Sequence, residues 1–95
     1  MINAILIDSR DNVATVTEPA APREEVHCRC GELCFAVTAL SDIPCYHKIA
    51  LRMIAQREPV YKYGEVIGFA KADIPAGAYV HTHNVADSLE EVDTP

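Results

Sequence analysis

The sequence predicts a mainly β protein, a single small domain of about seven short strands with little helix. Short runs rich in β-branched and aromatic residues alternate with turn residues, and an Asp-Ile-Pro turn occurs twice. The chain has 95 residues, of which 49% are hydrophobic and 23% charged. A chain of this size buries only about 60–65% of its unfolded surface, so one thin core is expected.

The first part of the chain predicts three strands and one loop. Ala4–Ile7 and Val13–Thr17 are rich in β-branched residues, and the polar stretch between them is typical of a turn. Residues 17–34 contain two prolines and several cysteines without periodicity, so we expect an atypical loop there. Leu33–Leu40 is apolar enough for a buried strand.

The second part predicts four more strands. In His47–Met53 the apolar residues alternate with other residues, which indicates a strand, although the helix-forming residues 50–57 make a helix the alternative. Val60–Tyr63, Val66–Lys71 and Tyr79–Val85 complete the set. We therefore expect a β domain over residues 1–85, followed by an acidic flexible tail over 86–95 that is frayed or bound by a partner.

An internal repeat supports this fold. Asp42-Ile43-Pro44 recurs as Asp73-Ile74-Pro75, and in both copies a β-branched residue follows six positions after the isoleucine. Ile54 and Val60 repeat the spacing without the Asp-Pro frame. In each copy the isoleucine is expected in the core while proline fixes φ and starts a turn.

Charge and composition exclude several classes of function. The net charge of −6 disfavours nucleic acid, whose phosphates repel an acidic surface. No apolar run is long enough to span a bilayer, and the apolar stretch near the N-terminus is too short for a signal peptide. We therefore expect a cytoplasmic protein with reduced cysteines. Residues 47–85 carry five bases against three acids, which favours a small anionic ligand.

Two histidines form the sharpest candidate site. On a strand, His81 and His83 would project from one face, so both rings could reach one metal ion or one anionic ligand. Asn84 adds an amide beside them. The alternative is a pair of surface histidines without a ligand.

A second candidate is Lys62, which stands between Tyr61 and Tyr63. Alternation along a strand would point the lysine away from both rings, so that its ammonium could meet a carboxylate; the alternative is a solvated lysine. Gly64 and Gly68 have no helix start between them, so they do not form a phosphate loop.

These motifs resemble one known family. The segments 47–51, 62–64, 66–68, 72–77 and 80–84 occur in the same order and spacing as in the SAF-type domain of altronate and galactarate dehydratases, which some members encode as a separate small subunit. The strand at 4–7 and the Asp11-Asn12-Val13-Ala14 segment are also similar. The resemblance implies a β-clip fold.

It also implies a function. A member of this family would be the small subunit of a metal-dependent sugar-acid dehydratase, a hydro-lyase that forms a 2-keto-3-deoxy acid together with a separate large catalytic subunit. The isolated chain is expected to be inactive. The implied cofactor is a divalent metal, iron or manganese. Candidate catalytic residues are His81, His83 and Lys62, with His81 and His83 also as metal ligands; candidate substrate-binding residues are His47, Lys48, Tyr63 and Asn84.

Two alternatives stay open: a sulfolactate sulfo-lyase subunit with a different leaving group, and a stand-alone SAF-type module that binds a carbohydrate or another ligand. The sequence also departs from the family pattern. Tyr46 and Arg57 stand where glycine is usual, and residues 17–34 replace a short turn. Cys28, Cys30 and Cys34 lie there in a spacing that is not a standard zinc motif, so a metal site is the less favoured interpretation; Cys45 follows later.

Overall fold

The computed structural model describes residues 2–94 and confirms a mainly β, SAF-like domain. These residues form nine short strands and one short helix. The elements are β1 (Ala4–Ile5), β2 (Val13–Val16), β3 (Glu25–Cys30), β4 (Leu33–Thr38), β5 (Lys48–Ala50), β6 (Pro59–Lys62), β7 (Glu65–Ala70), β8 (Tyr79–Val80), β9 (Val85–Ala86) and α1 (Leu89–Asp93).

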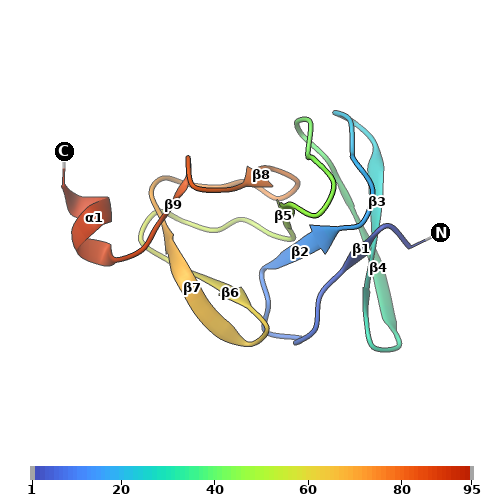
Figure 1. Ribbon diagram of the computed structural model, residues 1–95, viewed down its shortest axis with the longest axis horizontal. Helices are drawn as coiled ribbons and strands as arrows, with labels where there is room; N and C mark the ends of the chain where they lie inside the picture. The colour runs from blue at the N-terminus through green and yellow to red at the C-terminus, as the bar shows by residue number, and fades with distance from the viewer. Residues whose placement is uncertain (1, 95) are drawn as a thin grey trace.

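The strands form two sheets. The larger has six strands in the order β4-β3-β1-β2-β5-β8, in which β1 and β3 are parallel and the other neighbours antiparallel. The smaller has the order β6-β7-β9. Figure 1 shows an elongated molecule, with β3 and β4 at one end and α1 at the other. Its principal extents are 41 × 25 × 19 Å.

One turn is built four times. Each copy starts at a buried residue in an isolated antiparallel bridge, and these bridges join Ala20 to Ile43 and Ile54 to Ile74. Five residues later a strand begins, and the sixth residue is buried in every copy: Val26, Ile49, Val60 and Val80. The repeat of the two Asp-Ile-Pro turns is thereby confirmed, with Ile54 as a third copy and Ala20 as a fourth.

The third residue after each bridge residue has a positive φ. These residues are Arg23 at 76°, Tyr46 at 67°, Arg57 at 76° and Gly77 at 88°. A type II turn requires a left-handed residue at this position, and glycine is preferred there because it has no Cβ. In the three copies without glycine, a residue with a Cβ adopts the positive φ at an energetic cost.

The interior consists of two apolar clusters. The first contains Ala4, Val16, Val26 and Ile43, and the second contains Ile54, Val60, Ile74 and Val80. Strands β2 and β5 contribute to both clusters, since Val16 and Ile49 belong to the first while Val13 and Ala50 belong to the second. These two strands therefore connect the halves of the molecule.

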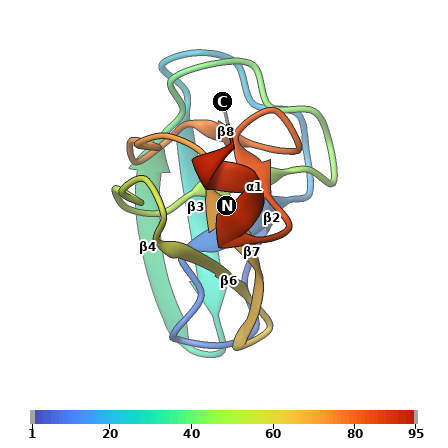
Figure 2. The same cartoon turned by 90° about the vertical axis from the view of Figure 1, so that its left-hand side faces the viewer.

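Residues 17–34 are not the loop that was expected. Glu25–Cys30 form strand β3, which pairs with β1 on one side and along its whole length with β4 on the other. The strand forms because its side chains alternate: Val26 and Cys28 are buried, while Glu25 and Arg29 are exposed. Figure 2 shows β3 and β4 side by side along one edge of the molecule.

Strand pairing is shorter than expected near the candidate site. Strand β5 covers Lys48–Ala50 and β8 covers Tyr79–Val80, because the register between them pairs two residues of each strand. His81 and His83 therefore lie in the turn between β8 and β9, and the expectation that they share a strand face was wrong. No helix forms over residues 50–57.

The acidic segment after Ala86 contains a short helix instead of an irregular tail. Helix α1 is capped by Ser88, whose hydroxyl accepts a hydrogen bond from the amide of Glu91 at 3.1 Å. The Arg57 guanidinium forms an ion pair with the Asp93 carboxylate, which holds the helix against the body of the domain. Within residues 2–94, no helix has the length and apolar character needed to cross a bilayer.

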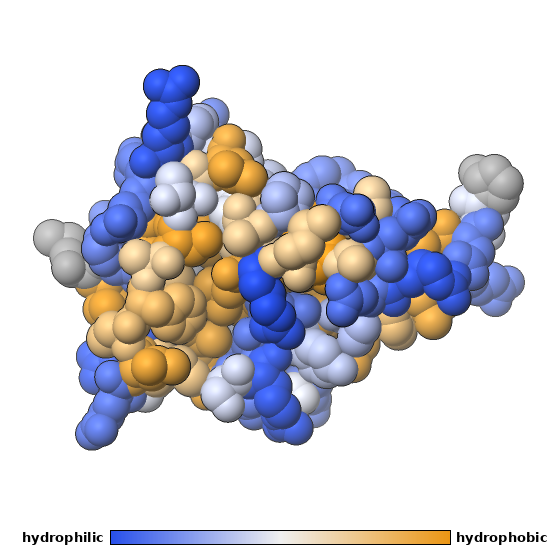
Figure 3. Space-filling view, turned by 180° about the vertical axis from the view of Figure 1, so that it is seen from behind, coloured by the Kyte–Doolittle hydropathy of each residue, from blue (hydrophilic) through white to orange (hydrophobic). Residues whose placement is uncertain are grey.

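Apolar surface gathers at one end of the molecule. In Figure 3 the orange area covers much of the end that carries β1, β3 and β4. Exposed large apolar side chains on and next to these strands are those of Ile5, Ile7 and Leu33.

Candidate functional site

Four aromatic side chains lie together where β5 meets β8. His47 directly precedes β5, Tyr79 starts β8, and His81 and His83 follow in the turn after β8. We call these four residues the histidine cluster. Because Ile49 pairs with Tyr79 across the two strands, residues on either side of this pair are brought together.

Contacts among the rings are close. The Tyr79 hydroxyl lies 2.6 Å from Nδ1 of His47, a hydrogen-bond distance. The ring centroids of His47 and His81 are 4.9 Å apart, and the Tyr79 ring stacks on His81 at 5.7 Å. His83 contacts the Tyr79 ring at 5.4 Å. The two predicted histidines therefore approach the same tyrosine, although they do not project from one strand face.

Asn84 holds this turn together. Its Oδ1 accepts a hydrogen bond from the amide of His81 at 2.9 Å, and its Nδ2 donates to the carbonyl of Tyr79 at 2.8 Å. The Lys71 ammonium donates to the carbonyl of Thr82 at 3.0 Å. Both hydrogen bonds go to backbone groups, so Asn84 fixes the backbone at Tyr79 and His81. Its binding of substrate stays a prediction.

A hollow of about 180 Å³ lies beside the cluster. It is lined by Lys48, Ile67, His81, Thr82, Val85 and Asp87. Of the predicted residues, Lys48 and His81 line this hollow, and the His47 ring lies next to the His81 ring. The sequence had not indicated Thr82 or Asp87. Asp87 follows β9, and the only feature of the sequence that could have indicated it is its acidic side chain.

The pKa values of two residues that line the hollow, His81 and Lys48, are lowered. Desolvation lowers the pKa of His81, and the neighbouring charges of His47, Lys48 and His83 lower it further. Desolvation also lowers the pKa of Lys48, with the charge of Lys62 as the second cause. Groups that disfavour one another's positive charge in this way are stabilised by a bound anion.

Lys62 and Tyr63 line a different hollow. A second hollow of about 170 Å³, mostly apolar, is lined by Ile5, Leu6, Ile7, Asp11, Val13, Thr15, Thr17, Lys62 and Tyr63. Lys62 does not point away from the tyrosine rings: its Nζ lies 4.8 Å from the centroid of the Tyr63 ring. Thr15 of this hollow is the cross-strand partner of Lys48, which lines the hollow beside the histidine cluster.

The described residues do not form a complete metal site. Among residues 2–94, no group of three or more His, Cys, Asp or Glu side chains is placed so that it could hold an ion. His81 and His83 could supply two ligands, and further ligands would have to come from elsewhere. No chemical step through a metal is therefore derived from this chain.

The cysteines of the β3–β4 hairpin are divided between two faces. Residues that pair across antiparallel strands share a face, so Cys34 lies on the face of its partner Arg29, and Cys28 lies on the opposite, buried face. Burial raises the pKa of Cys28 to about 11.

Fold and site together define a small SAF-like β domain in which histidine, lysine and tyrosine side chains gather beside a hollow. The chain belongs to the altronate/galactarate dehydratase SAF domain family, whose model matches residues 2–88. The resemblance seen in the sequence is thereby confirmed.

The chain is similar to two dehydratases and to a sulfo-lyase subunit. An altronate dehydratase of Escherichia coli is 40% identical over 89 residues, which are 94% of this chain and 17% of that protein. One from Bacillus subtilis is 32% identical over 92 residues, 97% of this chain and 18% of that protein. The alpha subunit of a (2R)-sulfolactate sulfo-lyase from Paracoccus pantotrophus is 46% identical over 50 residues, 53% of this chain and 75% of that subunit. The chain thus spans less than a fifth of the two dehydratases.

Proposed function

We propose that this chain is the small subunit of a sugar-acid dehydratase of the altronate or galactarate type. It would act in the cytoplasm with a separate large catalytic subunit and form a 2-keto-3-deoxy acid. Family membership and the two dehydratase relatives support the reaction class. The sulfo-lyase relative supports the subunit arrangement, because by its name a domain of this kind occurs there as a separate alpha subunit.

The observation that carries the proposal is that Lys48 and His81 line one hollow, with His47 next to His81. Lys48 would supply positive charge, and the His81 ring, whose pKa is lowered, would donate a hydrogen bond. Loss of water from an α-hydroxy acid requires removal of a weakly acidic proton next to the carboxylate, and negative charge then develops on the carboxylate oxygens. Cationic groups fixed around the carboxylate stabilise that charge. Lys48 and His81 would bind the carboxylate, while His47, oriented by Tyr79, would support His81.

Iron or manganese remains part of the proposal only for the assembled enzyme. His81 and His83 would contribute at most two ligands, and the large subunit would supply the others. The general base and the groups that assist departure of the β-hydroxyl would also belong to the large subunit.

Activity of the reconstituted enzyme tests the proposal. The chain is combined with its large subunit, and 2-keto acid formation from altronate and galactarate is measured. A double variant His81→Ala/His83→Ala should abolish turnover while this subunit stays folded. His27→Ala is the matched control, because His27 lies on β3 and pairs with Glu25 at 3.2 Å. Full activity of the double variant, or robust activity of the isolated chain, would contradict the proposal.

A sulfolactate sulfo-lyase subunit is the second candidate, favoured by the 46% identity to the Paracoccus subunit. The two reactions share removal of the proton α to the carboxylate and differ in the leaving group. Release of sulfite from sulfolactate, with no 2-keto acid formed from the sugar acids, would establish the second candidate. Tight binding of a sugar acid by the isolated chain, with no turnover in any assembly, would instead indicate a binding module.

A further inference from the structure

Two consecutive polar residues, Asp11 and Asn12, are buried just before β2. Asp11 is 2% exposed and Asn12 is 3% exposed. Burying a carboxylate and an amide is unfavourable unless hydrogen bonds replace the lost water. The partners of these two side chains therefore show what the burial achieves.

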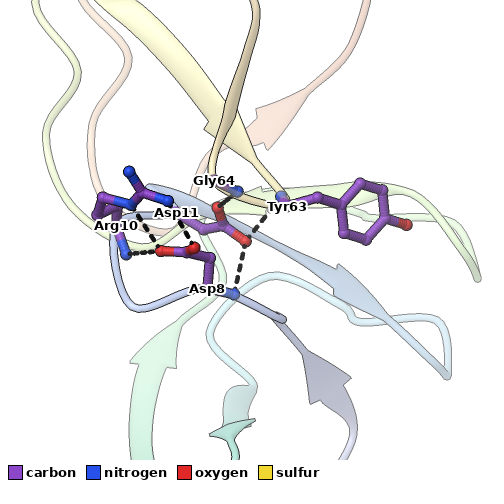
Figure 4. Close-up of polar contacts among 5 residues, drawn as sticks. All are labelled: Asp8, Arg10, Asp11, Tyr63 and Gly64. Carbon is purple, nitrogen blue, oxygen red and sulfur yellow. Dashed lines mark hydrogen bonds and ion pairs between the residues drawn. The ribbon is translucent and has the colours of Figure 1, made fainter.

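Asp11 holds the tip of the β6–β7 hairpin. Its Oδ1 accepts a hydrogen bond from the amide of Gly64 at 2.7 Å, and its Oδ2 accepts from the amide of Tyr63 at 3.0 Å. The Asp8 amide also donates to Oδ2 at 3.3 Å. Figure 4 shows the carboxylate of Asp11 between these amides, while the Tyr63 ring points away. Tyr63 and Gly64 both have positive φ, as the two central residues of a tight hairpin turn of type I′ require.

Asn12 holds the strand that leads to this tip. Its Nδ2 donates to the carbonyl of Pro59 at 3.0 Å, and its Oδ1 accepts from the amide of Tyr61 at 2.8 Å. Strand β6 is an edge strand, and its register with β7 shifts between Val60 and Tyr61. Asn12 thus bonds the Pro59 carbonyl and the Tyr61 amide on the edge of β6 that does not face β7. These groups flank the register shift between β6 and β7.

The hairpin tip fits tightly against the turn before Asp11. A Cβ added to Gly64 would lie 2.5 Å from Oδ2 of Asp8 and 2.7 Å from Nη2 of Arg10. Asp8 and Arg10 are themselves joined at 2.9 Å. A side chain at Gly64 would therefore require the Asp8 and Arg10 side chains to move, and it would also have to adopt a positive φ.

We infer that Asp11 and Asn12 are positioning residues that hold Lys62 next to Lys48. Lys62 lies between Tyr61 and Tyr63, and both of their amides are held by this pair. The hollow lined by Lys62 contains Thr15, whose cross-strand partner is Lys48. If the pair were removed, the hairpin would keep its own β6–β7 bonds but lose its attachment to the β1–β2 turn, and Lys62 would move away from Lys48.

The importance of this placement for catalysis rests on the proposed function, but the placement itself can be tested without any substrate. Lys48 reports on it because the charge of Lys62 contributes to the lowered pKa of Lys48. The full chain is labelled with ¹³C at its lysine side chains and titrated by NMR. Lys62→Met should move the pKa of Lys48 upward, which sets the full effect of removing the charge.

Asp11→Ala, Asp11→Asn and Asn12→Ala should move the pKa of Lys48 in the same direction. Amide exchange at Tyr61, Tyr63 and Gly64 should accelerate by about tenfold, the factor that corresponds to one lost hydrogen bond. Val26→Ala is the control: it destabilises the first apolar cluster, away from the hairpin, and should leave the pKa of Lys48 unchanged.

If Asp11→Ala does not fold, Asp11→Asn and Asn12→Ala decide the result, because each keeps part of the hydrogen bonding. An unchanged pKa of Lys48 in both, or in Lys62→Met, overturns the inference. Because no substrate is used, this outcome does not depend on dehydratase activity; a reconstituted enzyme that forms no 2-keto acid would instead contradict the proposed function alone.

Discussion

The hydroxyl of Tyr79 and Nδ1 of His47 lie 2.6 Å apart, and this contact joins the start of β8 to the start of β5. The Tyr79 hydroxyl can donate to Nδ1 or accept from it, so either neutral tautomer of His47 forms this hydrogen bond. The sequence contains both residues but gives no sign that they meet. Four predictions concern this contact, the hollow beside it, the β3–β4 hairpin and the turns.

Tyr79→Phe should reduce the free energy of unfolding by about 1 kcal/mol, the usual net value of one hydrogen bond. It should also change the tautomer ratio of His47, because Nδ1 loses its hydrogen-bond partner. Chemical denaturation measures the first effect, and ¹⁵N NMR of the imidazole measures the second. Tyr63→Phe is the control, since the Tyr63 side chain is largely exposed. Equal effects of the two substitutions would contradict this role of the hydroxyl.

Anion binding at the hollow should strengthen as the pH falls. The pKa of His81 lies below its ordinary value of 6.5, so at pH 7 its ring is mainly neutral and gains its proton only at lower pH. Lys48→Met removes one of the charges that lower this pKa, so the midpoint of His81 should rise. NMR titration of the His81 ring measures it, with Arg29→Met as the control on a distant strand. An unchanged midpoint in Lys48→Met would show that the two groups do not interact.

Cysteine reactivity should divide along the two faces of the β3–β4 hairpin. Cys28 is buried, and its pKa is raised to about 11, so its thiolate is scarce at pH 8. Cys34 is exposed. Iodoacetamide at pH 8 should therefore label Cys34 well before Cys28, as peptide mass spectrometry would show. Denaturant should abolish the difference. Equal labelling rates in the folded protein would mean that β3 is not packed as described.

Tyr46→Gly should stabilise the domain by about 0.5–1 kcal/mol, because glycine adopts a positive φ without the steric cost that tyrosine bears. The opposite change at the equivalent position gives the contrast. Gly77→Ala should destabilise the domain by about 1–3 kcal/mol, because the new Cβ would collide with the carbonyl of Thr38. Thermal and chemical unfolding measure both. A destabilised Tyr46→Gly variant would show that the exposed tyrosine ring makes contacts that outweigh the strain.

Much of the fold could be predicted because its turns have local chemical signatures. The Asp-Ile-Pro turns at Ile43 and Ile74 identify the positions where buried strands begin. The fourth copy, at Ala20, carries no such frame, so β3 was missed. Helix α1 was missed although Ser88 and Glu91 stand three apart, which is the spacing of a capping box.

The candidate site was predicted in its composition but not in its geometry. Alternation suggested that His81 and His83 extend β8, but the Asn84 side chain takes the His81 amide and closes a turn. A local side-chain bond of this kind competes with strand pairing. The positions of Tyr79 next to His47 and of Asp87 on the hollow depend on pairing between strands far apart in the sequence, which no local pattern indicates.

The four turns belong to two halves of the domain, each with its own apolar cluster. One pair of bridged turns organises the half from which the β3–β4 hairpin extends, and the other pair organises the half that carries α1. The histidine cluster lies at the seam, where Tyr79 packs on the first cluster and its neighbour Val80 lies in the second. The β3–β4 hairpin could therefore differ in length while the histidine cluster keeps its position at the junction of β5 and β8.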